Sequence, residues 1–169
     1  HSPEMAECAL RTDGALGELI ARLEPRWDDT VLMVVSDHDQ ELVTAHGVDL
    51  QTELEARGIP GLVETEGTAA LVMNGPDIDT LLTLPAVEGA QAVDADNTIV
   101  WGADGVVFGL WLDELRGSHG SPRCDRQVAV IGGGHPAVEQ LGEALTAARP
   151  HATWWAPTIA GLLDFELID

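Results

Sequence analysis

Two short, uninterrupted apolar segments constrain the fold of this chain more than any other feature. Residues 30–35 read Thr-Val-Leu-Met-Val-Val, and residues 127–131 read Gln-Val-Ala-Val-Ile. Runs of this length, rich in β-branched residues and without alternating polar positions, are typical of strands covered on both faces, as in a parallel α/β sheet. The sequence therefore predicts an α/β fold with a mostly parallel sheet flanked by helices.

Helical patterns accompany both apolar segments. Ser2 is a good capping residue and Pro3 suits the first helical position, so a helix is predicted from here to about Leu23. Beyond the second apolar segment and a run of three glycines, two more helices are predicted at residues 136–149 and 156–163. Alternation of helices with buried strands supports the α/β class.

Residues 49–108 have a different pattern, with shorter predicted elements and more turn residues. Short helices are predicted at 50–56 and 77–84. Short strands separated by Asp, Asn and Gly turns are predicted at 62–64, 68–73, 87–93, 98–101 and 106–108. We therefore expect residues 1–48 and 109–169 to form the α/β portion, and residues 49–108 to form a small α+β insertion.

Composition excludes several classes of protein. The chain has 169 residues, of which 45% are hydrophobic, so a folded globular protein is expected. Its 29 acidic and 8 basic residues give a net charge of −21, which would repel a nucleic-acid duplex or an anionic membrane surface. No apolar run approaches the roughly 18 residues of a membrane span. This excess of acidic residues is typical of proteins from a high-salt cytoplasm. A solvated acidic surface on an ordinary protein explains it equally well.

Asp37 and His38 follow the first apolar segment directly, after Ser36. In α/β sheets, sites are built beyond the C-terminal ends of strands. Because successive strand side chains point to opposite faces, these two can meet only if the backbone has left the strand. A carboxylate oxygen beside an imidazole nitrogen suits zinc, manganese or iron. A charged loop after a strand explains the dipeptide equally well.

A second histidine of interest, His119, lies in the Gly-Ser-His-Gly motif at 117–120. Glycine permits positive φ and a close approach of the backbone to a bound ion or ligand. By itself, such a histidine is more often a surface residue than a ligand. His135 is interpreted as a helix-entry residue, because the glycines before it match no phosphate-binding fingerprint, and His46 and His151 as turn residues.

The order of these motifs resembles the C-terminal half of the alkaline phosphatase superfamily, in its type I phosphodiesterase and nucleotide pyrophosphatase branch. The resemblance rests on Ser-Asp-His after a buried strand, an inserted module, Gly-Ser-His-Gly, and a further strand before Ala-Pro-Thr-Ile-Ala at 156–160. It implies two divalent metal ions, with zinc expected, beyond the end of a mostly parallel sheet. These ions bind a phosphoryl group that a threonine or serine nucleophile attacks.

The resemblance also implies four metal ligands. Asp37 and His38 match the pair that binds the metal nearest the nucleophile, and His119 matches a ligand of the other metal. His1 stands directly before the predicted helix start, as does the histidine that joins His119 in the family. The aspartate that accompanies His1 would lie four residues upstream, so a segment is expected to be missing before residue 1.

The chain departs from the family pattern in two ways. Asp39 stands where the family usually has glycine, and no residue matches the nucleophile or the two remaining aspartate ligands. The chain is thus expected to be the C-terminal portion of a two-metal hydrolase of phosphate diesters or pyrophosphates, inactive in isolation. Its expected partners are a small phosphorylated substrate and the remaining N-terminal half of the same domain.

Two other functions remain open from the sequence. A noncatalytic binding or regulatory module would carry the Asp-His and Gly-His turns by coincidence. A phosphonoacetate hydrolase or a sulfatase-like hydrolase would share the same scaffold, and its substrate would be selected by loops and the insertion.

Overall fold

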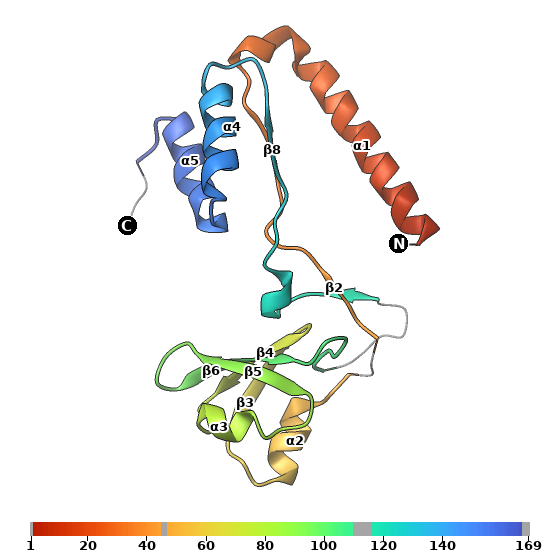
Figure 1. Cartoon of the computed structure of the whole chain (residues 1–169), viewed down its shortest axis with the longest axis vertical. Coiled ribbons are helices and arrows are strands. Elements are labelled where there is room, and N and C mark those ends of the chain that lie inside the picture. The colour runs from red at the N-terminus through yellow and green to blue at the C-terminus, as the bar shows by residue number, and fades with distance from the viewer. Residues whose placement is uncertain (1, 45–46, 110–115, 167–169) are drawn as a thin grey trace. The chain divides into compact units, whose positions relative to one another are not determined.

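The computed structural model describes residues 2–44, 47–109 and 116–166, and the chain divides into two compact units. The terminal unit comprises residues 1–36 and 128–169, and the central unit comprises residues 37–127. Figure 1 shows the elements of each unit. The assignment of residues 1–48 and 109–169 to the α/β portion, and of 49–108 to an insertion, stays a prediction.

The helices of the terminal unit form where the sequence predicts them. Helix α1 spans Pro3–Leu23, and the Ser2 Oγ accepts a hydrogen bond from the Met5 N–H at 3.2 Å. The remaining helical elements are a 3₁₀ helix at Glu24–Asp29, α4 at Ala137–Ala148, a 3₁₀ turn at Ala152–Trp154 and α5 at Trp155–Leu162. Helices α4 and α5 lie side by side (Figure 1). No helix in the described ranges has the length and apolar character that a membrane crossing needs.

The two apolar segments form strands that pair antiparallel. Strand β1 (Leu32–Val35) lies against β8 (Ala129–Gly132), with Leu32 opposite Gly132 and Val35 opposite Ala129. The prediction of a mostly parallel sheet is therefore wrong. The chain leaves the terminal unit through β1 and returns through β8, and an outgoing strand paired with the returning one must be antiparallel.

The strands formed by the apolar segments are less buried than their composition predicts. Val34 and Val35 are 37% and 40% exposed, and Val130 is 56% exposed. A run of apolar residues measures hydrophobicity, but it does not specify which neighbours cover a strand or in which direction they run. The two-stranded β1–β8 ladder is therefore only partly covered within the described chain.

The central unit contains a four-stranded antiparallel sheet of order β3-β4-β6-β5. Its strands are β3 (Leu62–Glu66), β4 (Ala69–Met73), β5 (Val87–Ala92) and β6 (Asn97–Gly102). Helices α2 (Leu50–Ala56) and α3 (Ile78–Leu81) accompany this sheet (Figure 1). A second, two-residue ladder joins β2 (Glu41–Leu42) to β7 (Gly117–Ser118), and a 3₁₀ turn follows at Pro122–Cys124.

The main apolar core lies in the central unit. Leu50 and Leu54 of α2 pack with Val72, Val100 and other buried apolar residues of the unit. Aspartates cap both short helices: the Asp49 carboxylate accepts from the Thr52 N–H, and the Asp77 carboxylate from the Thr80 N–H. Capping satisfies backbone donors that have no partner inside a helix. In this unit, the helices that the capping residues begin are also the helices that contribute to the core.

Candidate functional site

Asp37 and His38 lie just past the end of β1, where the backbone is irregular. One carboxylate oxygen of Asp37, Oδ2, is 3.3 Å from His38 Nε2. The other, Oδ1, accepts a hydrogen bond from the His38 backbone N–H at 3.0 Å. Because the chain has left the strand, the two neighbouring side chains meet, which is the condition that a shared metal ion requires.

The second ring nitrogen of His38 is held by the backbone. Its Nδ1 lies 2.8 Å from the carbonyl oxygen of Asp39. A carbonyl can only accept a hydrogen bond, so Nδ1 carries the proton in the neutral ring and Nε2 keeps its lone pair. A histidine that donates from one nitrogen to a carbonyl is oriented to bind a metal through the other.

His119 stacks on His38. The ring centroids are 4.3 Å apart, and the ring planes are inclined by 22°. His119 follows β7, whose Ser118 pairs with Glu41 of β2. The two histidine motifs, far apart in the sequence, therefore come together inside the central unit.

Two glycines allow the His119 loop to approach the β3–β4 turn. Gly120 has φ 117°, and a Cβ there would lie 2.6 Å from the Glu66 carbonyl oxygen. A Cβ on Gly67 would collide with Ser118 Oγ. The glycines beside His119 thus permit a close backbone approach within the protein, in addition to any approach to a ligand.

A polar cluster beside this loop was not predicted from the sequence. The Glu41 side chain is 7% exposed, and its Oε2 accepts from Arg123 Nε at 2.7 Å. Its other carboxylate oxygen accepts a short hydrogen bond from the Thr68 hydroxyl. The sequence carried only a weak signal for this cluster: an arginine four residues after His119, in a chain with few basic residues.

The cluster shifts the pKa of its buried carboxylate and that of the neighbouring thiol. Burial by itself would raise the pKa of Glu41, but hydrogen bonds from Ser121, Thr68 and Arg123, with the arginine charge, hold that pKa below its usual value. Burial chiefly, and then the negative charges of Glu41 and Asp39, raise the pKa of the Cys124 thiol. Cys124 is therefore kept as an uncharged thiol, which is a poor nucleophile and metal ligand.

Two of the remaining histidines, His135 and His151, have structural roles. His135 Nδ1 accepts from the Ala137 N–H at 3.1 Å at the start of α4, and His151 Nδ1 accepts from the Thr153 N–H at 3.4 Å. The amide of Gly134 donates to the Trp27 carbonyl, so it is occupied within the protein. His46 lies outside the described residues.

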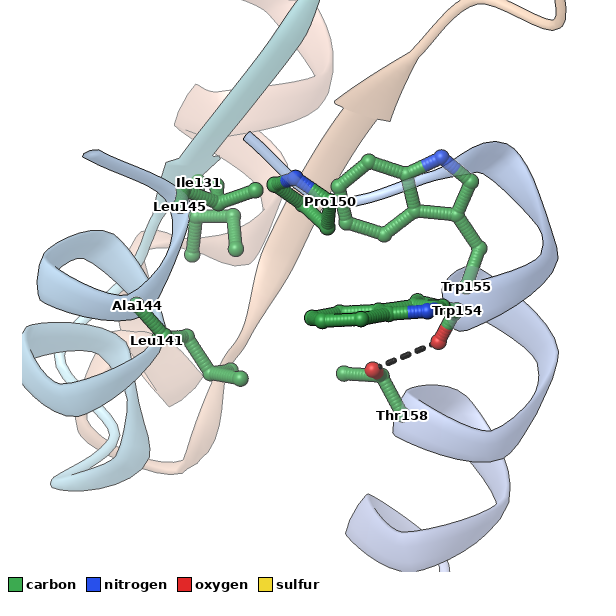
Figure 2. Close-up of a pocket in the computed structure, with 8 residues that line it drawn as sticks. All are labelled: Ile131, Leu141, Ala144, Leu145, Pro150, Trp154, Trp155 and Thr158. Carbon is green, nitrogen blue, oxygen red and sulfur yellow. Dashed lines mark hydrogen bonds between the residues drawn. The ribbon is translucent and has the colours of Figure 1, made fainter. Parts of the chain in front are cut away.

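A small pocket in the terminal unit offers no competing chemistry. It has a volume of about 60 Å³ and lies between α4, α5 and β8, where Leu141, Ile131 and Trp154 contribute to its wall (Figure 2). The Thr158 hydroxyl beside it donates to the Trp154 carbonyl at 2.7 Å. The residues that line this pocket include no acid, base or thiol, so we regard it as a packing gap.

Comparison with known proteins identifies the family. A family model described as type I phosphodiesterase / nucleotide pyrophosphatase matches residues 1–115. The chain belongs to this family. Neither the curated proteins nor the solved structures include a match to the chain.

Family membership confirms the resemblance noted in the sequence. The matched region includes the Asp37–His38 pair, and it ends before His119. A type I phosphodiesterase / nucleotide pyrophosphatase is a hydrolase of phosphodiesters or pyrophosphates, so the family indicates this class of activity. The metal-binding roles of Asp37, His38 and His119 stay predictions.

The chemistry of the predicted ligands fits a divalent metal. Asp37 and His38 present oxygen and nitrogen donors 3.3 Å apart. Asp39 Oδ1, nearby in the chain, is buried and has no hydrogen-bond partner among the described residues, and a cation would compensate such an oxygen. No group of three or more His, Cys, Asp or Glu that could hold an ion occurs in the part of the chain that is described. His1 lies outside that part.

Proposed function

We propose that this chain carries part of the metal-binding centre of a hydrolase that cleaves phosphate diesters or pyrophosphates. Asp37 and His38 hold one divalent ion, and His119 with His1 holds the other. The stacking of His38 on His119, at 4.3 Å between ring centroids, carries the proposal. This stacking supports the proposal because it holds one predicted ligand of each metal side by side, and a two-metal centre needs its ions close together.

Each of the described residues has a definite task in such a centre. When bound, two zinc ions would stabilise the charge on the attacking and leaving oxygens of the phosphoryl group. Asp37 supplies a carboxylate that offsets ion charge, and the Asp39 carbonyl fixes the His38 ring through Nδ1. The substrate is a small phosphorylated molecule, because the net charge of −21 would repel a long polyanion.

The isolated chain is proposed to be inactive. The nucleophile and two aspartate ligands come from the remaining N-terminal half of the catalytic domain. The partly exposed apolar side chains of β1 and β8, such as Val35 and Val130, support a partner that packs on the terminal unit. Purified chain with zinc is expected to show no turnover of bis-p-nitrophenyl phosphate. Turnover that Asp37→Ala abolishes would contradict the inactivity.

Zinc titration tests the ligands directly. The wild-type chain is expected to bind Zn²⁺ weakly, because it supplies two ligands to each centre and two ligands are too few for tight binding. His38→Ala and His119→Ala should each lower the affinity by about tenfold or more. His151→Ala is the matched control, since His151 caps a short 3₁₀ turn in the terminal unit. Equal losses in all three variants, or tight stoichiometric binding by the wild type, would contradict the proposal.

A further inference from the structure

We propose that Glu41, Thr68 and Arg123, here called the Glu41 clamp, position the His119 ring against His38. The clamp residues contact no substrate and hold no metal in this proposal, so they are positioning residues. The purpose of the clamp rests on the proposed function, because the stacked histidines are the proposed metal ligands. Its structural action can be tested without any metal.

Glu41 is the centre of the clamp. Its carboxylate lies in the protein interior and accepts hydrogen bonds from Arg123 Nε and from the Thr68 hydroxyl. The Cys124 thiol donates a third, at 3.6 Å. A buried carboxylate is costly unless it is paired and hydrogen-bonded on several sides, so these interactions depend on one another.

Arg123 connects the clamp to the sheet. Beside its bond to Glu41, its Nη2 donates to the Gly102 carbonyl at 2.7 Å, and its Nη1 pairs with Glu88 of β5. Three acceptors on different elements therefore fix the planar guanidinium. Arg123 follows His119 closely in sequence, so the guanidinium anchors the segment that leaves the His119 loop.

Thr68 holds the His119 loop through its backbone and its side chain. Its N–H donates to the His119 carbonyl at 2.7 Å. Its hydroxyl oxygen accepts from the Ser121 N–H at 3.0 Å, while the same hydroxyl donates to Glu41. Thr68 is fully buried, so these bonds are shielded from water. The backbone of the loop is therefore held at His119 itself and again two residues later.

The clamp joins the two segments that carry the histidines. Glu41 lies three residues after His38, and Arg123 lies four residues after His119. Between these segments the backbone ladder of β2 and β7 has two residue pairs, Glu41–Ser118 and Leu42–Gly117, and one further backbone bond at 3.0 Å, from the Val43 N–H to the Arg116 carbonyl. A ladder this short is weak and sets its register poorly, and a slip of one residue would turn His119 to the other side. Side-chain interactions therefore help these backbone bonds to fix the register.

A buried ion pair is a poor source of stability compared with apolar packing of the same volume. Its advantage is that hydrogen bonds have direction, so they select one arrangement of the chain. An apolar cluster at Glu41, Thr68 and Arg123 would tolerate several loop positions. The geometry of the clamp therefore points to placement of the His119 ring and not to stability alone.

The experiment compares three threonine variants of the full chain by NMR and by zinc titration. Thr68→Val keeps the shape and removes the hydroxyl, and Thr68→Ser restores the hydroxyl. Thr98→Val, at a partly buried position in β6, is the matched control. In the metal-free chain, Thr68→Val should abolish the nuclear Overhauser signals between the two rings, and it should lower Zn²⁺ affinity by about tenfold. Thr68→Ser and Thr98→Val should keep both.

The outcomes separate the clamp from the proposed function. Inter-ring Overhauser signals that vanish in Thr68→Val and persist in Thr68→Ser support the clamp, even if the wild type binds no zinc and the proposed function fails. Inter-ring signals and zinc affinity that are unchanged in Thr68→Val overturn the clamp. If Thr68→Val does not fold, Arg123→Lys replaces it, since it keeps the charge and removes the guanidinium hydrogen bonds. Unchanged inter-ring signals in that variant also overturn the clamp.

Discussion

The two units of this chain differ sharply in how they use apolar residues. Among the described residues, every buried apolar side chain except Ala160 belongs to the central unit. The terminal unit exposes large apolar side chains on α1, β1, β8 and α5, including Leu10 of α1 at 72% and Val130 of β8 at 56%. Helices and strands have formed in both units, but only the central unit has built a core.

This difference shows that a helix or a strand can form without being buried. Helix α1 has a good cap and a regular apolar stripe, yet none of its residues is buried. In proteins most helical stability comes from the packing of the apolar face rather than from propensity. We therefore expect the free energy of unfolding of the chain to reside mainly in the central unit.

Truncating one leucine in each unit should give the largest contrast. Leu50→Ala empties a fully buried position and should lower the free energy of unfolding of the central unit by about 2–5 kcal/mol. Leu10→Ala should change the stability by less than about 0.5 kcal/mol, because Leu10 is 72% exposed. Amide hydrogen exchange, read separately for each unit, measures both. Similar losses in the two units would show that α1 is buried in solution.

Replacing the buried carboxylate of the central unit should have the next largest effect. Glu41→Gln is expected to lower the stability of that unit by about 1–3 kcal/mol near neutral pH, because Arg123 loses a buried partner. Urea unfolding of the wild type and the variant measures this loss.

The Glu41 variant should also change the response to acid. The folded-state pKa of Glu41 lies below its unfolded value of about 4.3, so its carboxylate stabilises the fold above that pH. This stabilisation is lost as the pH falls through the folded-state pKa. Glu41→Gln should therefore unfold with a weaker dependence on pH below about 4.3. An unchanged dependence would mean that Glu41 is not held as a carboxylate in the fold.

Two glycine substitutions should have effects of opposite sign. Gly120→Ala should destabilise the central unit by about 1–3 kcal/mol, because φ is 117° and the new Cβ would meet the Glu66 carbonyl. Gly17→Ala in α1 should stabilise the helix by about 0.5–1 kcal/mol, since the new Cβ would have no atom of the described chain within 4 Å apart from its chain neighbours and the helix backbone. Circular dichroism measures the helicity of the two variants, and thermal unfolding measures their stability. A loss of stability in Gly17→Ala would mean that something packs on α1.

Local signals predicted the main helices and the longer strands, but they missed the two-residue strands β2 and β7, and the strand predicted at 106–108 does not form. The capping pattern at Ser2 and Pro3 identified the start of α1, and the predicted helix at 50–56 coincides with α2. These signals involve residues a few positions apart, so the sequence contains them in full. The direction of β1 relative to β8 was predicted wrongly, since pairing depends on residues almost a hundred positions apart in the chain.

The candidate site divides in the same way. Asp37, His38 and His119 were chosen from their residue types and neighbours, and the structure stacks the two histidine rings. The Glu41 clamp was not predicted. Nothing in the sequence pairs an acid in a two-residue strand with an arginine 82 positions later, because such pairs are selected by folding alone.

The sequence by itself determined the main helices and the longer strands, the family of the chain and the residue types available for metal binding. These properties depend on nearby residues and on motifs. The tertiary structure alone decided the antiparallel pairing of β1 with β8, the placement of the core in the central unit and the stacking of His38 on His119. Burial and strand pairing depend on which distant segments meet in the fold. The sequence of one strand does not specify which strand pairs with it or in which direction.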